Sequence, residues 1–339
     1  MNVRFFEPGK QYLKYKKELD KAWKRIATNG DLILRQDVED FEKMVAEYTG
    51  AKYAVSLNSC TDALYLCLRW AGIGPGDEVL VPSRTFVATP QVIVQLGATP
   101  VYYDLDGEFE FTDKTRAIMP VHIEGMIDPD FEELVIRAKE AGVIVIEDAA
   151  QALGAILNGK QAGTFGNAGC FSFYPAKIMG AFGDAGAVIT NDKNLYEYLL
   201  EARNHFKVTN ADWGVNSRLD NLQAAFLNVK FPHLNDMLDR RAEIADRYDL
   251  DLKGCTLPQQ VPGRVYQDYI IRTPKRDELF EFLKAEGIET LKNNYPFPVP
   301  KLPQAQAYED ETLRLPCNDV LEYNEVNYVI SKVNEFFKK

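Results

Sequence analysis

The sequence is poor in histidine and cysteine, the residues that build most structural metal sites. Its 339 residues include three histidines and five cysteines, and the cysteines form no C-x-x-C pair. An odd number of cysteines without a repeated spacing is typical of reduced thiols in a cytosolic protein, not of a disulfide framework. We therefore expect a cytoplasmic protein without a metal site.

A basic excess and long apolar runs are also missing. Lys and Arg number 39 against 50 Asp and Glu, which gives a net charge of −11. Nucleic-acid-binding proteins usually carry a basic patch that replaces phosphate counterions, so we expect no nucleic-acid partner. No apolar run reaches the roughly 18–20 residues that a membrane span needs. The first residues contain no apolar stretch of the kind found in secretory signals, and we expect no membrane partner.

The first half of the chain alternates short apolar runs with helical patterns. We expect strands at 53–58, 78–82, 99–105, 116–122 and 143–150. We expect helices at 38–49 and 128–142, and one at 85–97 that Pro90 interrupts early. Strands that alternate with helices at this rhythm are typical of βαβ units and a mostly parallel sheet.

The pattern changes after residue 168. Two apolar strands flank a loop that contains Lys177, and a long polar helix at roughly 233–253 leads into the C-terminal part. That part contains a strand at 264–273 and helices at 277–287 and 325–339. We predict an α/β protein with a large domain at 1–240 and a smaller C-terminal α/β domain at 241–339.

Asp148 lies at the carboxyl end of VIVIED, the most apolar of the expected strands. Ligands of open α/β sheets sit at the carboxyl ends of the strands. A carboxylate at that position is partly desolvated, which is costly unless the carboxylate is paired. A helix cap or a turn residue is an equally good explanation of Asp148 taken alone.

Lys177 lies in the segment FSFYPAKIMGAFGDAGAV, among aromatic and small residues. No other charged residue lies between Lys160 and Asp184, which argues against an ordinary solvated lysine. Desolvation lowers the pKa of a lysine and favours the neutral amine that Schiff-base chemistry needs. A lysine and a buried carboxylate are what pyridoxal phosphate (PLP) requires, one for its aldehyde and one for its ring nitrogen.

PLP also needs a phosphate site. The segment Ser59-Cys60-Thr61-Asp62 lies at an expected strand-to-helix junction, where backbone N–H groups, a hydroxyl and a helix N-terminus could receive a phosphate. Cys60 and Thr61 are therefore candidate phosphate-binding residues. A simple helix cap is at least as good an explanation of this segment on its own.

Three motifs in order, EDAAQALGA, FSFYPAKIMGAFGDAGAV and GVNSRLDNLQAAFL, resemble the successive signatures of the DegT/DnrJ/StrS family. These are PLP-dependent aminotransferases of fold type I that act mostly on nucleotide-linked keto sugars. The resemblance runs from about residue 30 to the end of the chain. It implies a seven-stranded, mostly parallel sheet between helices in the large domain, and a working unit that is at least a homodimer with shared active sites.

Roles follow from this resemblance motif by motif. Lys177 resembles the lysine that bonds PLP, and Asp148 the carboxylate at its ring nitrogen. The resemblance places Gln151 at the ring oxygen or against the ring, and Phe86 stacked on the pyridine. Thr61 and Ser172 match phosphate-binding hydroxyls, and Asn216 matches an asparagine that reaches the phosphate of the neighbouring subunit.

Several of these residues also have ordinary structural explanations. Phe86 could be a core residue, Gln151 a surface amide and Ser172 a residue that bonds nearby backbone. Asn216 could be a turn residue. The chain also departs from the family pattern, because Leu153 and Asn294 stand where histidines are common, the latter before Tyr295 and Pro296. The sugar pocket is therefore expected to differ from that of the best-known members.

The resemblance implies transfer of an amino group from an amino acid, with L-glutamate as the expected donor, to a keto group of a nucleotide-linked deoxysugar. Such reactions serve amino-sugar or surface-polysaccharide biosynthesis. A PLP-dependent sugar dehydratase and a cyclitol aminotransferase are the alternatives on the same fold. A regulatory protein that merely keeps the fold is a third possibility, against which the intact Lys177 and Asp148 argue.

Overall fold

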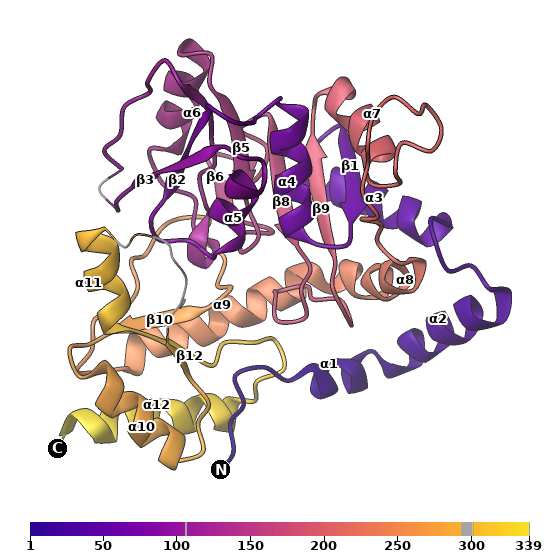
Figure 1. Cartoon of the computed structure of the whole chain (residues 1–339). Helices are drawn as coiled ribbons and strands as arrows, with labels where there is room; N and C mark the ends of the chain where they lie inside the picture. Colours follow the sequence, from indigo (N-terminus) through magenta and orange to yellow (C-terminus); the bar gives the residue numbers. More distant parts are fainter. Residues whose placement is uncertain (106, 293–299, 301, 339) are drawn as a thin grey trace.

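The computed structural model describes residues 1–105, 107–292, 300 and 302–338. Its centre is a seven-stranded sheet in the order β1-β9-β8-β5-β4-β2-β3, with helices on both faces (Figure 1). The strands are β1 (Tyr53–Leu57), β2 (Glu78–Pro82), β3 (Thr99–Tyr103), β4 (Thr115–Ile118), β5 (Ile144–Asp148), β8 (Ala168–Ser172) and β9 (Gly186–Thr190). A two-stranded ribbon of β6 (Ile156–Leu157) and β7 (Lys160–Gln161) lies outside this sheet.

The large sheet is parallel except for β9. Strands β3, β2, β4, β5 and β8 pair in parallel in that order across the sheet. Strand β9 runs antiparallel to both of its neighbours, β8 and β1. The predicted mostly parallel, seven-stranded sheet is therefore confirmed.

Two helix layers cover this sheet because successive strand residues point to opposite faces. Ala54 belongs to one apolar cluster and the next residue, Val55, to the other. The first cluster includes side chains from α3 (Gln36–Thr49), α6 (Phe131–Glu140) and α8 (Asn221–Lys230). The second includes side chains from α4 (Cys60–Trp70), α5 (Ala88–Gln95) and α7 (Lys193–Ala202). The result is a three-layer body whose central sheet is buried on both faces.

A third apolar cluster lies in the C-terminal part. There β10 (Tyr269–Arg272), β12 (Thr312–Leu315) and β11 (Leu291–Lys292) form an antiparallel sheet in that order. The helices of this part are α10 (Arg276–Ala285), α11 (Pro303–Glu311) and α12 (Tyr323–Lys338). Helix α9 (Leu234–Asp251) crosses into it, and the predicted boundary between 240 and 241 falls inside this helix. That boundary stays a prediction.

The N-terminal residues return to the C-terminal part. Val3 pairs with Ile288 in an isolated parallel bridge and packs in the third cluster. Two helices follow, α1 (Pro8–Lys14) and α2 (Lys16–Asn29). From α1, the side-chain amide of Gln11 donates to Asp319 Oδ1 at 2.8 Å and Lys10 Nζ lies 2.8 Å from Glu325 Oε1. The first fifteen residues are thus tied to the last thirty.

Local details differ from the sequence-based expectations. Helix α5 begins only at Ala88, so Pro90 lies in its first turn, where no N–H has an intrahelical partner, and does not interrupt it. The expected strand at 264–273 is shortened to β10, because residues before Tyr269 contact other segments through their side chains and carbonyls. Short 3₁₀ turns form at Ile123–Gly125 and Phe231–His233.

Within the described residues, no helix combines the length and apolar composition needed to cross a bilayer.

Glu147 ties the loop before β8 to the sheet. Its side chain is fully buried, and its two oxygens accept hydrogen bonds from the backbone N–H groups of Gly163, Phe165 and Gly166 at 2.6–2.7 Å. The ring nitrogen Nε2 of His122 lies 2.9 Å from Glu147 Oε2. These contacts hold Glu147, the residue directly before Asp148, in place.

Glu147→Gln should destabilise the protein by about 2–3 kcal/mol, because the amide NH₂ would face backbone donors that it cannot bond. Urea unfolding of the purified protein measures this difference. Glu140→Gln, on the exposed end of α6, is the control and should change stability by no more than about 0.5 kcal/mol. Equal stabilities for the two variants would contradict this account of Glu147.

Candidate active site

Most of the predicted site residues meet at one edge of the large sheet. Strand β5 ends at Asp148, which pairs with Cys170 of β8. Two residues on, Ser172 pairs with Gly186 of β9, and Gly186 in turn pairs with Leu57 of β1. Because β1 leads directly into α4, the register brings the start of that helix beside Ser172. Residues more than a hundred positions apart in sequence therefore share one edge.

Asp148 is buried and precisely held. Its side chain accepts a hydrogen bond from Thr89 Oγ1 at 2.8 Å and one from the backbone N–H of Ala150 at 3.1 Å. The hydroxyl of Thr85 lies 2.7 Å from that of Thr89 and extends the chain of polar contacts. Burial raises the pKa of Asp148, while the Thr89 hydroxyl, the Ala150 N–H and the charges of Lys177 and His122 oppose the rise.

Lys177 lies in the loop between β8 and β9. Burial lowers the pKa of Lys177, opposed by the negative charges of Asp268, Asp148 and Cys60, and Arg314 lowers it further. The mutual influence of Lys177 and Asp148 on their pKa values requires the two side chains to lie near each other. The structure therefore brings together the amine and the carboxyl that were expected to share one cofactor.

Three side chains hold the loop that carries Lys177. Gln267 bonds the backbone on both sides of the lysine, at Ala176 O and Ile178 N. The ammonium group of Lys230, which is buried at the end of α8, donates to Gly180 O and to Gln11 Oε1. Gln223 bonds both the N–H and the carbonyl of Phe182. The loop is thus fixed along its length by polar groups from α8 and from the segment before β10.

The start of α4 forms a narrow cradle. Ser59 caps the helix, with its hydroxyl accepting the N–H of Asp62 at 3.1 Å, and Cys60 and Thr61 form the first turn. A Cβ atom on Gly186 would lie 2.3 Å from the Ser59 carbonyl carbon and 2.4 Å from Cys60 N. Only glycine permits this approach. Burial raises the pKa of the Cys60 thiol. The charge of Asp148 also raises this pKa, and the charge of Lys177 lowers it.

The remaining predicted residues lie around this centre in different ways. Ser172 Oγ accepts the N–H of Tyr174 at 3.3 Å. Gln151 Oε1 accepts the N–H of Glu124 at 2.7 Å. Phe86, 51% exposed, immediately follows Thr85. Asn216 is exposed and forms an isolated bridge with Asn204.

Two of the positions where the chain departs from the family pattern have different outcomes. Leu153 is buried in the first apolar cluster, so it serves the core. Asn294, Tyr295 and Pro296 lie outside the described residues.

Sequence reasoning missed the residues that hold the two central groups. Thr85 and Thr89 belong to the same segment as Phe86, PSRTFVATP, so two hydroxyls four residues apart at the start of a helix were an available signal. Gln267 lies ninety residues beyond Lys177 and nothing in the sequence marks it. Arg203 bonds Glu42 Oε1 at 2.5 Å and Ser56 O at 2.9 Å inside the protein.

Arg84 and Arg218 also have partners within the protein. Arg84 forms an ion pair with Glu124 and stacks on the ring of Tyr308, 3.9 Å from its centroid. Arg218 donates to Asn204 Oδ1 at 2.8 Å.

Comparisons with known proteins decide the family. The model of the DegT/DnrJ/EryC1/StrS aminotransferase family matches residues 14–334. The chain belongs to this family. It is 40% identical to a dTDP-3-amino-3,6-dideoxy-alpha-D-galactopyranose transaminase of Aneurinibacillus thermoaerophilus, over 98% of this chain and 99% of the relative. It is 38% identical to a pleiotropic regulatory protein of Geobacillus stearothermophilus, over 100% and 99%.

A solved structure agrees with this family membership. The S. venezuelae protein DesV, in complex with a ketimine intermediate, superposes with a TM-score of 0.93 at 36% identity, covering 100% of this chain and 99% of DesV. The predicted fold-type-I architecture is confirmed, and the protein is a PLP-dependent aminotransferase, since PLP is the cofactor of this DegT/DnrJ/EryC1/StrS family.

The residues at the sheet edge fit the cofactor of the family. An aldehyde needs an amine that is neutral at working pH, and burial of Lys177 favours that form. A protonated ring nitrogen needs a carboxylate, and Asp148 is held for such a partner by Thr89. A phosphate needs unpaired N–H groups, which the first turn of α4 provides.

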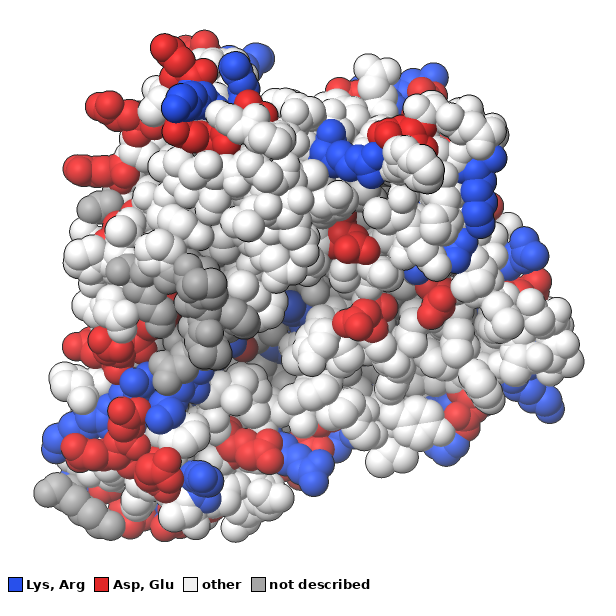
Figure 2. Space-filling view, in the orientation of Figure 1, with Lys and Arg blue, Asp and Glu red and all other residues white. Residues whose placement is uncertain are grey.

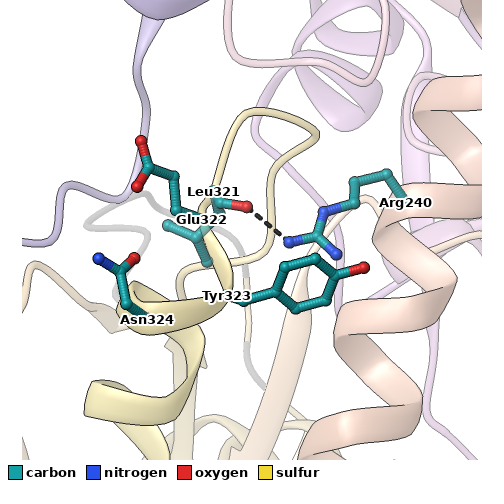
Figure 3. Close-up of a pocket in the computed structure, with 5 residues that line it drawn as sticks. All are labelled: Arg240, Leu321, Glu322, Tyr323 and Asn324. Carbon is teal, nitrogen blue, oxygen red and sulfur yellow. Dashed lines mark hydrogen bonds between the residues drawn. The ribbon is translucent and has the colours of Figure 1, made fainter.

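A pocket elsewhere on this aminotransferase lacks such chemistry. Arg240 of α9 and four residues at the start of α12, Leu321 to Asn324, line it (Figure 3). The guanidinium of Arg240 donates to Leu321 O at 2.7 Å and stacks over Tyr323. None of the predicted site residues lines this pocket, and no lysine or buried carboxylate is among its lining residues.

The close approach at Gly186 gives a test of the cradle. Gly186→Ala should weaken PLP binding about tenfold, because the methyl group pushes the start of α4 away from the edge of the sheet. Titration of the apoprotein with PLP, followed by visible absorbance, measures the dissociation constant. Gly74→Ala is the control, because a Cβ there meets no atom within 4 Å. Unchanged affinity in the Gly186 variant would show that the cradle does not hold the phosphate.

Proposed function

We propose that this aminotransferase moves an amino group from L-glutamate to a keto group of a nucleotide-linked deoxysugar, with Lys177 and Asp148 at the centre of its active site. The observation that supports this most directly is the presence of a buried carboxyl, Asp148, and a half-buried amine, Lys177, that influence each other's pKa values. Amino-sugar biosynthesis is the process that such a reaction serves.

Lys177 has two tasks in this proposal. Its neutral amine would bond the aldehyde of PLP, and once free it would move a proton at the Cα of the amino donor. Burial lowers the pKa of Lys177 and so favours the neutral form that both tasks require. When bound, PLP supplies an electron sink for the electrons released at that Cα.

Asp148 keeps the ring nitrogen of the cofactor protonated. The carboxyl group is buried, and an ionised carboxylate there is stabilised by a cationic partner. Thr89 occupies one of its oxygens and the Ala150 N–H the other, so the orientation of the group is set before the ring arrives. Such preorganisation costs no rearrangement during the reaction.

The other predicted residues would hold and shield the cofactor. Phe86, whose side chain is 51% exposed, would stack on the ring. Gln151 lies at the ring or at the ring oxygen. The phosphate binds at the first turn of α4, with Cys60, Thr61 and Ser172 around it. These roles rest on the motifs and on the position of the residues at one sheet edge.

The substrate class follows from the relatives. The Aneurinibacillus relative has the name of a transaminase for a dTDP-linked amino sugar, and several further relatives carry names of the same kind. We therefore propose a nucleotide-linked keto sugar as the acceptor. Because Leu153 is buried where family members often present a histidine, the sugar contacts are expected to come from other residues.

A homodimer with shared active sites belongs to the proposal. Asn216 is exposed, and the loop before it exposes Val208 and Trp213 to 81% and 87%. The middle of the face on which α4 and α5 lie carries few charged side chains (Figure 2). Depletion of charge and exposure of aromatic residues are typical of interfaces. In this arrangement Asn216 reaches the phosphate in the neighbouring subunit.

A cytoplasmic location completes the proposal. All five cysteines are free thiols, and the Sγ atoms of buried Cys67 and Cys170 lie 3.9 Å apart. Reduced thiols in such proximity are what a reducing compartment maintains.

The half-reaction with the donor tests the function. PLP-loaded protein incubated with L-glutamate should release 2-oxoglutarate. Lys177→Ala should abolish this reaction, and Asp148→Asn should slow it on the order of a hundredfold or more, because the ring nitrogen loses its charged partner. Lys193→Ala, in an exposed lysine of α7, is the control and should react normally. Failure to react with any amino acid would favour a sugar dehydratase.

Mixing inactive subunits tests the shared site. In a hybrid of Lys177→Ala and Asn216→Ala subunits, one site carries both substitutions and the other carries neither. Random exchange should restore about a quarter of the wild-type activity. Mixtures of Lys177→Ala and Asp148→Asn should stay inactive, because each site takes both residues from one chain. Equal outcomes for the two mixtures would place Asn216 in its own subunit's site or in none.

A further inference from the structure

Gln267 holds the backbone on both sides of Lys177. Its side-chain Oε1 accepts the N–H of Ile178 at 3.0 Å, and its Nε2 donates to the carbonyl of Ala176 at 3.0 Å. Gln267 is only 7% exposed. The amide orientation follows from its partners, because a backbone N–H needs the oxygen and a carbonyl needs the NH₂ group.

Such a double contact restrains the lysine itself. The bonded carbonyl belongs to the residue before Lys177 and the bonded N–H to the residue after it. One planar amide therefore fixes the two peptide groups on either side of the Lys177 Cα and, with them, the direction in which its side chain leaves the backbone. The lysine side chain has four rotatable bonds. Fixing the position of its Cα reduces the number of conformations in which its amine lies away from the cofactor site.

Gln267 is itself immobilised from the C-terminal part. Arg241, 3% exposed, donates to the carbonyls of Tyr266 and Gln267 at 3.0 Å each and to that of Cys317 at 2.6 Å. The next residue, Asp268, forms an ion pair with Arg314 at 3.1 Å. The contact with the lysine loop is thus part of a rigid polar cluster that spans α9, the segment before β10 and the segment after β12.

We propose that Gln267 is a positioning residue, which aims the amine of Lys177 at the cofactor from the C-terminal part of the chain. The proposal rests on the assignment of Lys177 as the cofactor lysine. It separates two duties at this site: α4 binds the phosphate of the cofactor, whereas Gln267 governs how completely the lysine engages the aldehyde.

Borohydride trapping distinguishes these duties. Holoprotein is reduced across a pH series, and mass spectrometry gives the fraction of Lys177 that carries the cofactor. In Gln267→Ala the released lysine gains water and is more readily protonated, so the pH of half-maximal trapping should rise and kcat should fall about tenfold. Gln267→Glu keeps the side-chain length but cannot donate to Ala176 O when ionised, and it should show the same direction of change.

Gln223→Ala is the matched control. It also removes a glutamine that bonds one N–H and one carbonyl of the same loop, but at Phe182, five residues beyond Lys177. We expect its trapping profile to match the wild type, with a melting temperature lowered less than in Gln267→Ala because its hydrogen bonds are exposed.

Two outcomes would overturn the positioning role. One is trapping and kcat within about twofold of wild type in both Gln267 variants, well below the effect of two lost hydrogen bonds. The other is an equal change in Gln223→Ala, which would reduce the effect to general loosening of the loop. Wild-type protein that traps no cofactor at Lys177 fails differently, because it removes the assignment of the lysine itself.

Discussion

The burial of one amine and one carboxyl at the same sheet edge is the constraint on which the rest of this structure depends. Neither group is favourable there alone, because a desolvated charge is costly without a partner. The surrounding polar contacts are arranged accordingly: Thr89 and the Ala150 N–H hold Asp148, and Gln267 and Lys230 hold the loop of Lys177. In the proposed function, a cofactor that links the two groups provides each of them with a partner.

The reversed strand β9 explains how this edge is assembled. Because β9 lies between β1 and β8 and runs against both, the chain leaves β8, makes the lysine loop and returns at the same edge. The first residue on its return is Gly186, against the start of α4. Lys177 thus lies within this loop, and the N-terminus of α4 lies against Gly186, the residue at which the loop ends.

The sequence predicted the elements of this arrangement better than its connections. Asp148 and Lys177 were recognisable because each is a charged residue in an apolar setting, and the βαβ rhythm predicted the sheet. The side chains that hold the lysine loop were not recognisable from the sequence. Gln267 is an ordinary amide in a segment predicted to be a strand, and its contact with residues 176 and 178 arises only from tertiary packing. The prediction that Pro90 interrupts a helix was wrong. Proline is tolerated in the first turn of a helix, and the sequence alone does not show that α5 begins at Ala88. Motif order and the family match supplied what periodicity could not, membership of the aminotransferase family.

The return of the first residues to the C-terminal part has a consequence for the order of folding. The contacts of Val3 with the segment around Ile288 and of Gln11 with Asp319 span nearly the whole chain, and closing loops of that length is slow. On the ribosome these N-terminal residues must wait until almost all the rest has been synthesised. Since Gln11 also accepts from Lys230, which supports the lysine loop, helix α1 connects that loop to Asp319 in the C-terminal part.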